Sequence, residues 1–262
     1  MKTVVFQSYR TTGVPGWIGT CMATVKGWAQ SQDFDYRCFD DSFLDLAPAW
    51  YRERCAGEIC TLTDLCRLIM AHRLLESGYG RTLWVDADML VFAPQALRLD
   101  EAAGFAFCLE LWPQLDAAGQ LQCSTRVNNS MTLFTKEGNH LDFFQGAALR
   151  IAAARPRLHK LDVGTNFLTG LGQVMPLPLF SNVGIFSPVL MHAIATGDDA
   201  ILAAYGGFLP QRIACANLCH SLAGERVQGY VADETIFDGV VDKCLATQGD
   251  VVNAHVRRGR TG

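Results

Sequence analysis

Short apolar runs alternate along this chain with longer stretches in which apolar residues recur at helical spacing. The short runs predict strands at residues 3–9, 35–41, 82–88, 104–111 and 130–135. The helically spaced stretches predict helices at residues 17–32, 63–77, 140–156 and 189–195. Residues 165–188 are loop-rich and are harder to assign to elements.

This alternation of strands and helices predicts an α/β fold with a mainly parallel, Rossmann-like sheet flanked by helices. The chain of 262 residues, half of them hydrophobic, can bury a large core, and no repeat or long linker divides it. We therefore expect a single domain over residues 1–262. In such folds ligands bind beyond the carboxyl ends of the strands.

The clearest chemical signal lies at one such end, in the segment RTLWVDADMLVFAP at residues 81–94. Asp86 and Asp88 follow a predicted buried strand, and on an extended chain residues two apart point the same way. Two carboxylates that face one point suit a hard divalent cation, Mn²⁺ or Mg²⁺, which also binds substrate phosphates. The alternative is a solvated turn with an incidental pair of acids.

Composition argues against several other functions. The formal net charge of -4 and a pI near 5.8 give no sign of a nucleic-acid partner. The ten cysteines are scattered without a CxxC pair, which argues against a zinc ribbon and favours reduced core thiols in a cytosolic protein. No uncharged run reaches the length of a membrane span, so we expect a cytoplasmic protein. A peripheral contact with the inner face of the membrane stays open.

Residues 63–94 resemble the central part of the retaining GT-A glycosyltransferases with a sugar-binding DXD motif, family 32 and its relatives. The motifs that match, in the family's order and spacing, are Thr63-Asp64-x-x-Arg67, Gly78-Tyr79-Gly80 and Asp86-Ala87-Asp88. Weaker similarities lie at residues 127–134, 163–171 and 176–188. The resemblance implies a GT-A fold and transfer of a sugar, with retention, from a UDP- or GDP-sugar to a carbohydrate or lipid-linked acceptor.

The resemblance also implies roles for single residues. Asp88 would bind the metal directly, and Asp86 would contact the donor ribose, or the metal through water. The metal would bridge the two donor phosphates and neutralise the leaving diphosphate. Asp64 and Arg67 would point from their helix to the donor, and Asn129 would lie near it. The alternative for Asp64 and Arg67 is an i,i+3 ion pair on the surface.

The family's C-terminal metal ligand, a histidine, has no plain counterpart here. Asn217 falls where that ligand is expected, and an amide oxygen is an acceptable ligand for a hard ion. The other candidates are His220, Asn253 and His255, the last of which precedes a basic tail. We expect this tail, from about residue 250, to be mobile without ligand and ordered over a bound nucleotide-sugar. The alternative is a solvated basic end, free or against acidic lipids.

Retention requires either a carboxylate nucleophile or attack by the acceptor on the face from which the leaving group departs. Glu110, at the end of the strand after the DXD motif, is the first candidate for a catalytic carboxylate. Asp233 and Glu234 are a second option. Trp112, beside Glu110, either stacks on a sugar ring or packs in the core.

Two other functions fit part of the pattern. Haloacid-dehalogenase-like phosphatases also carry DXD after a strand, with the first aspartate, here Asp86, as nucleophile, and TGDDA at residues 196–200 imitates their later acidic motif. Their motif continues with Thr or Val where this chain has Leu90, and it lies near the start of the domain, whereas about 80 residues precede it here. A nucleotide-sugar binder without turnover is the third class, and a full metal site argues against it.

Overall fold

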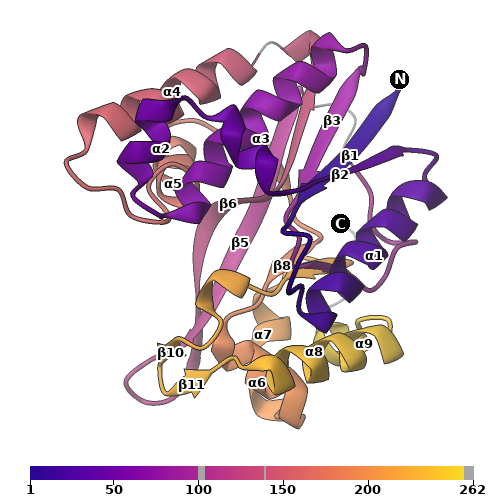
Figure 1. The fold of residues 1–262 in the computed structure, drawn as a ribbon. Helices are drawn as coiled ribbons and strands as arrows, with labels where there is room; N and C mark the ends of the chain where they lie inside the picture. Colours follow the sequence, from indigo (N-terminus) through magenta and orange to yellow (C-terminus); the bar gives the residue numbers. More distant parts are fainter. Residues whose placement is uncertain (100–103, 139, 257–262) are drawn as a thin grey trace.

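The structure, a computed structural model, describes residues 1–99, 104–138 and 140–256, and its centre is a six-stranded sheet (Figure 1). In spatial order the strands are β2 (Asp35–Phe39), β1 (Thr3–Ser8), β3 (Arg81–Val85), β6 (Leu121–Thr135), β5 (Phe105–Leu115) and β7 (Leu179–Phe180). Every pairing in this sheet is parallel except those that β6 makes with β3 and β5. The prediction of an α/β fold with a mainly parallel sheet is confirmed.

Helices cover both faces of this sheet because successive strand residues point to opposite sides. Val5 and Leu83 pack on one face, against α1 (Gly16–Ser31). Phe6 and Trp84, their neighbours in sequence, pack on the other face. The helices that gather there, at the upper left of Figure 1, are α2 (Ala49–Cys55), α3 (Ile59–Glu76), α4 (Leu141–Ala154) and α5 (Thr165–Val174).

The lower part of the molecule in Figure 1 holds a smaller three-stranded sheet and the remaining helices. The strands, in spatial order, are β4 (Met89–Val91), β9 (Cys215–Asn217) and β8 (Val183–Ile185). The helices are α6 (Pro188–Thr196), α7 (Asp199–Phe208), α8 (Glu234–Ala246) and α9 (Asp250–Asn253). A hairpin of β10 (Arg226–Val227) and β11 (Tyr230–Val231) lies beside the tip of β5 and β6 (Figure 1). Because β4 follows β3 after three residues, the DXD segment joins the two sheets.

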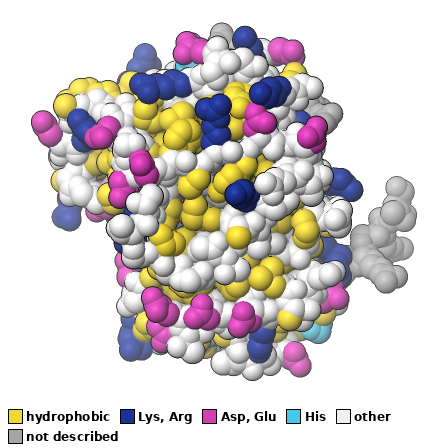
Figure 2. All heavy atoms as spheres, turned by 45° about the vertical axis from the view of Figure 1, so that its right-hand side comes forward, with side chains coloured by type: hydrophobic (Ala, Val, Ile, Leu, Met, Phe, Trp, Pro, Cys, Tyr) yellow, Lys and Arg dark blue, Asp and Glu magenta, His cyan; other side chains and the backbone are white. Residues whose placement is uncertain are grey.

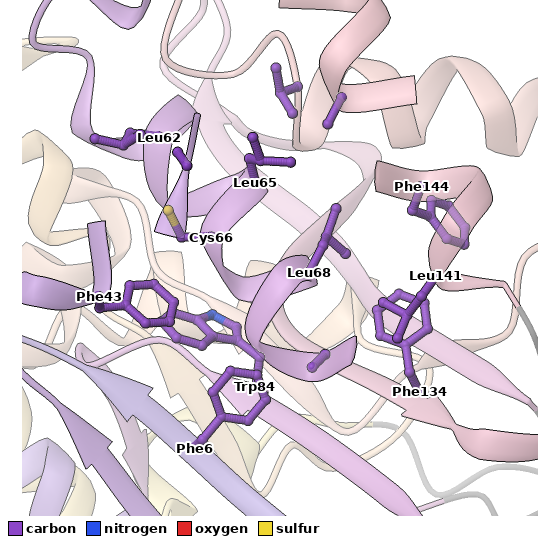
Figure 3. Close-up of a cluster of buried hydrophobic side chains, with 14 of the residues drawn as sticks. Phe6, Phe43, Leu62, Leu65, Cys66, Leu68, Trp84, Phe134, Leu141 and Phe144 are labelled. Atoms are coloured by element: carbon purple, nitrogen blue, oxygen red, sulfur yellow. The ribbon is translucent and has the colours of Figure 1, made fainter. Parts of the chain in front are cut away.

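Trp84 ties the end of β3 into the core (Figure 3). Its indole stacks on Phe43 at 5.4 Å between ring centroids and meets Phe6 edge-on at 5.3 Å. Leu65 and Cys66 of α3 belong to the same buried cluster. Tight packing of this kind fixes the direction in which the chain leaves the sheet after Val85.

The structure differs from the sequence prediction mainly in its helices. Residues 165–174 form α5, whereas the sequence analysis predicts loop there. The helix packs on β6, and this long-range packing stabilises it. The helices α2, α7, α8 and α9 were not predicted. β6 starts at Leu121 and not near residue 130, since its first half is largely polar and does not show strand alternation.

Charged side chains of both signs are interspersed on the face drawn in Figure 2, and no large basic surface gathers there. All ten cysteines lie within the described residues and are free thiols, most of them buried. Within the same described residues, none of the helices is both long and apolar enough to cross a membrane.

Candidate active site

A pocket of about 790 Å³ lies at the carboxyl ends of β1 and β3 and extends along β5 and β6. This volume falls within the range of small-molecule sites in proteins, ~300–1,000 Å³. The predicted site residues that line it are Asp64, Arg67, Asp86, Asp88, Glu110, Asn129 and Asn217. The structure therefore brings together most of the residues that the sequence singles out.

The DXD segment is a turn held on three sides. Met89 donates its backbone N–H to the carbonyl of Asp86 at 3.1 Å, which closes the turn. The Asp86 N–H donates to the carbonyl of Ser130 in β6 at 2.7 Å, and Gln7 in β1 donates from Nε2 to the Asp86 carbonyl at 3.0 Å. Leu218, next to β9, donates to the carbonyl of Asp88 at 3.1 Å. Both sheets thus fix the backbone that carries the two carboxylates.

The carboxylates of the turn accept hydrogen bonds from separate donors. Trp84 Nε1 donates to Asp86 Oδ1 at 2.6 Å, so the residue that anchors β3 in the core also orients the first carboxylate. The backbone N–H of His220 donates to Asp88 Oδ2 at 2.7 Å. The imidazole of His220 lines the pocket and packs edge-on against Tyr9 and Trp17.

Asn217 lies where a third metal ligand was expected, but it presents its nitrogen to the aspartates. Its Nδ2 lies 2.8 Å from Asp88 Oδ1 and 3.3 Å from Asp86 Oδ2. The orientation of the amide follows from its other end, since Oδ1 accepts the N–H of Cys219 at 2.7 Å. Ligation through the amide oxygen would require the side chain to turn over and give up this bond.

Arg67 links the helix α3 to the DXD turn. Its Nη2 lies 2.9 Å from Asp64 Oδ1 and its Nη1 lies 3.4 Å from Asp86 Oδ1, while Nη1 also donates to the carbonyl of Asn129. The guanidinium carbon lies 4.9 Å from the centre of the Trp84 ring. Arg67 and Asp64 are each 6% exposed, so the alternative of an ion pair on the surface is wrong: the pair is i,i+3, but it is buried.

Asp64 is held from two further sides. Asn129 donates from Nδ2 to Asp64 Oδ1 at 2.8 Å. Gly164, at the start of α5, comes so close that a Cβ added there would lie 2.7 Å from Asp64 Oδ2. A larger residue at this position would therefore displace the Asp64 and Asn129 side chains.

Burial raises the pKa values of these carboxyls. The pKa of Asp64 and that of Asp86 rise to about 6, mainly because both lose contact with water, and the Arg67 guanidinium opposes the rise in each. Burial also raises the pKa of Asp88, against the hydrogen bond from His220. The single cation Arg67 therefore offsets only part of the negative charge that the three carboxyls carry when they ionise.

The raised pKa of Asp64 predicts how this residue makes the stability of the fold depend on pH. Its pKa is higher in the folded chain, about 6, than its ordinary value of 3.8, so its contribution to stability is complete below pH 4 and is lost as pH rises through 6. Relative to Asp64→Asn, the native protein should gain about 2 kcal/mol between pH 7.5 and pH 4.5, because the gain of about 1.4 kcal/mol per pH unit begins only below about pH 6. Urea unfolding of both proteins at the two pH values measures this gain. An equal difference at both would contradict the buried, charged state of Asp64.

Glu110 lies in a second group of polar residues, which a bulge in β6 positions. Ala106 pairs with Leu133, but Cys108 pairs with Asn128, so residues 129–132 form a bulge in the pairing with β5, while Met131 and Thr132 still pair with β3. Asn128, directly before the bulge, donates from Nδ2 to Glu110 Oε2 at 2.8 Å. Glu110 is only 3% exposed, and burial raises the pKa of its carboxyl.

Other predicted residues lie outside the pocket. His255 is not among the lining residues, because its backbone and Cβ pack against Gly206 of α7. Asn253 is buried and exchanges two hydrogen bonds with the backbone of Ile213. Asp233 caps α8 by accepting the N–H of Ile236, and Glu234 begins that helix. The tail predicted to close over the donor begins within α9, and its residues 257–262 lie outside the described part of the chain.

The pocket also contains residues that sequence reasoning missed. Tyr9 and Arg10 follow β1 directly, and the rule that ligands bind beyond strand ends would have found them. The Tyr9 hydroxyl is buried and has no hydrogen-bond partner among the described residues. Lys160 and Arg126 also line the pocket, but no local pattern in the sequence marks them.

Comparisons with known proteins do not identify a function for this chain. The chain matches no protein family, and no curated protein shows significant similarity to it. Among solved structures it is similar to a glycosyltransferase involved in the glycosylation of the major capsid of PBCV-1. That similarity has a TM-score of 0.46 and 8% identity, over 84% of this chain and 94% of the other. It is also similar to A197 from STIV, with a TM-score of 0.26 and 12% identity, over 66% and 78% of the two chains. At these TM-scores and identities neither similarity carries a functional argument.

Proposed function

We propose that this chain is a metal-dependent glycosyltransferase that moves a sugar from a UDP- or GDP-sugar to a carbohydrate or lipid-linked acceptor, with retention. One observation carries the proposal. The Asp64–Arg67 pair, the DXD turn and Asn129 meet in one pocket at the carboxyl edge of the sheet. Two of the three motifs on which the resemblance to GT-A glycosyltransferases rests, and the asparagine of one weaker similarity, supply these residues.

Asp86 and Asp88 would hold the Mn²⁺ or Mg²⁺ ion. Both carboxylates lie within 3.3 Å of one amide nitrogen, that of Asn217, so both can face a single cation. The described residues contain no group of three or more His, Cys, Asp and Glu side chains that could hold a metal. Donor phosphate and water oxygens would therefore complete the coordination. When bound, the ion would neutralise charge on the departing diphosphate.

The donor sugar would lie against Asp64, whose carboxylate can accept hydrogen bonds from sugar hydroxyls. Arg67 would act through its neighbours, because its guanidinium is already engaged by Asp64, Asp86 and the Asn129 carbonyl. We therefore propose a positioning role for Arg67, which differs from the direct donor contact that the resemblance implies.

Glu110 is proposed as the catalytic carboxylate. Retention uses such a group either as a nucleophile or as a negative charge that stabilises the cationic sugar in the transition state. The bond from Asn128 fixes the Glu110 side chain, and burial strengthens its electrostatic effect on a neighbouring charge. Glu110→Gln, which keeps the shape of the side chain, would remove both functions.

The test of the proposed function is a screen of nucleotide-sugars with the full chain. We expect one UDP- or GDP-sugar to be hydrolysed or transferred in the presence of Mn²⁺, and EDTA to abolish that turnover. A generic phosphomonoester such as p-nitrophenyl phosphate should stay intact. Cleavage of the phosphomonoester alone would indicate a phosphatase. Binding of nucleotide-sugars without turnover of any would indicate a binding protein, and either result would overturn the proposal.

Gly164→Ala should disturb the donor side of this site. The new Cβ would lie 2.7 Å from Asp64 Oδ2 and 2.9 Å from the amide atoms of Asn129, so both side chains would have to move. We expect the donor KM to rise about tenfold and stability to fall by about 1–3 kcal/mol. Steady-state kinetics and urea unfolding measure the two effects.

Gly170→Ala is the matched control for Gly164→Ala. Gly170 lies in the same helix, and a Cβ added there meets nothing within 4 Å. This change should leave the donor KM as it is and stabilise the helix by about 0.5–1 kcal/mol. Equal kinetic effects of the two substitutions would mean that contact with Asp64 and Asn129 is not the cause.

A further inference from the structure

A second group of side chains shares one face of the β5–β6 hairpin, beside the group of aspartates. Glu110 and Trp112 are two residues apart on β5, and Arg126 and Asn128 are two apart on β6, so each pair points the same way. Glu110 lies directly opposite Arg126 in the antiparallel register. All four residues line the pocket. Trp112 and Arg126 are diagonal neighbours, a relation in which side chains lie ~7–8 Å apart.

Arg126 retains hydrogen-bonding capacity for a ligand. Its Nη1 lies 3.8 Å from Glu110 Oε1, which is an ion pair but too long for a hydrogen bond. The described residues supply no hydrogen-bond acceptor to its guanidinium. The Arg126 side chain is 36% exposed, whereas that of Glu110 is 4% exposed and accepts its hydrogen bond from Asn128. A ligand beside these two residues would therefore contact mainly the Arg126 guanidinium and not the Glu110 carboxylate.

Two of the cations that line the pocket, Arg67 and Arg126, serve separate groups of carboxylates. The other two have partners elsewhere, because Lys160 pairs with Glu225 at 3.3 Å and Arg10 donates to the carbonyl of Gly13 at 3.2 Å. Arg67 is the cation that acts on the three aspartates of the donor side. Arg126 is the cation that acts on Glu110. The two groups are adjacent, since Asn128, which binds Glu110, and Asn129, which binds Asp64, are consecutive residues of β6. A molecule at Arg126 would thus be a neighbour of the donor and not a part of it.

The β10–β11 hairpin forms the outer wall of this second place. Gln228 accepts the N–H of Leu115 at 2.9 Å and donates to its carbonyl at 2.7 Å, which joins the hairpin to the end of β5. Val227 of the same hairpin lines the pocket. The surface around Arg126 therefore combines an aromatic ring, an apolar wall and a guanidinium, which suits a sugar ring that carries an anion.

We infer that the acceptor is a carbohydrate that carries an anionic group, either a carboxylate or a phosphate; this inference rests on the proposed function. Arg126 would bind the anionic group, and Trp112 would stack on a sugar ring. The planar fork of arginine matches both oxyanions through two parallel N–H donors. Neutral sugars would lack this contact and would leave the guanidinium beside Glu110 without an acceptor. The subsite would therefore select acidic over neutral acceptors.

A glycan array tests this inference with the labelled full chain, UDP or GDP, and Mn²⁺. The array carries matched oligosaccharides that are neutral, that contain a uronic acid, or that carry a phosphate ester, so that the two sources of negative charge are separated. We expect at least about tenfold stronger binding of one acidic class than of its neutral counterpart, the gain typical of a charge-assisted hydrogen bond. Equal binding of neutral and acidic glycans, or binding of none, would overturn the inference.

Variants connect that preference to Arg126. Arg126→Met should bring the ratio of acidic to neutral binding close to one, and Arg126→Lys should keep an intermediate ratio because it retains charge but not the fork. Arg126→Lys also leaves a cation beside Glu110, so it still tests the inference if Arg126→Met does not fold. Arg150→Met, at an exposed position of α4 away from the pocket, is the matched control and should keep the ratio of the native chain. An unchanged ratio in both Arg126 variants would overturn the inference.

Turnover of nucleotide-sugars with the same preparations separates this inference from the proposed function. Mn²⁺-dependent hydrolysis of a donor without any preference for acidic glycans would overturn the acceptor inference alone. Absence of turnover with every donor would overturn the proposed function, whatever the array shows.

Discussion

Asp88→Asn should lower Mn²⁺-dependent turnover of the nucleotide-sugar about a hundredfold or more, a loss of ~3 kcal/mol of transition-state stabilisation. The change keeps the size and polarity of the side chain but removes one of the two charges that would attract a hard cation. The fold should survive, because the native Asp88 carboxyl is buried beside Asp86 and its pKa is raised by that burial. The amide oxygen of the new side chain can still accept the N–H of His220.

Asp242→Asn is the control for Asp88→Asn. Asp242 is an exposed aspartate on α8 that does not line the pocket, so its neutralisation should leave turnover unchanged. Steady-state kinetics over a range of Mn²⁺ concentrations, together with urea unfolding of each variant, separates loss of the site from loss of the fold. Near-native turnover of Asp88→Asn with the same dependence on Mn²⁺ would show that the metal assignment is wrong.

The sequence could predict those parts of the fold that local patterns control. The strands β1, β2 and β3 and the helices α1, α3, α4 and α6 lie where apolar periodicity places them. The helix α5 was missed because its sequence, TNFLTGLGQV, contains two glycines and two threonines that weaken its intrinsic preference. Its stability comes from packing on β6, which no window of sequence contains.

In the candidate site, too, the sequence predicts the positions that local spacing determines and not those that depend on long-range pairing. Asp64 and Arg67 are three residues apart on one helix, and Asp86 and Asp88 share one turn, so spacing alone places each pair. Arg126 faces Glu110 only because of the register that β6 has before its bulge, which the sequence does not reveal. His255 was selected for its chemistry, but its contact with Gly206 of α7 holds it outside the pocket.

Arg67→Met should destabilise the protein by about 3–5 kcal/mol at pH 7.5, the usual cost of leaving buried charges without their partner. In the structure the guanidinium serves Asp64, Asp86 and the carbonyl of Asn129, and it lies over the Trp84 ring. Its removal therefore leaves two carboxylates with little compensation. An exposed ion pair would instead contribute less than about 1 kcal/mol.

The loss caused by Arg67→Met should also depend on pH in a definite direction. Arg67 lowers the pKa of Asp64 and of Asp86 from the values that burial alone would give. Without Arg67 both pKa values rise further in the folded chain, so the variant continues to lose stability as pH rises above about 6, where the native protein no longer does. Urea unfolding at pH 4.5 and 7.5 should therefore show a larger difference between the two proteins at the higher pH.

Two further variants separate the contribution of the planar guanidinium of Arg67 from that of its positive charge. Arg67→Lys restores a cation and should recover part of the stability, but a single ammonium cannot reach the three acceptors that the fork serves, so turnover should stay low. Asp64→Asn combined with Arg67→Met removes one charge from each side of the pair and should be less destabilised than Arg67→Met alone. Because a double-mutant cycle isolates the pairwise contribution, a coupling energy near zero between positions 64 and 67 would mean that the buried pair does not organise the donor side of this pocket.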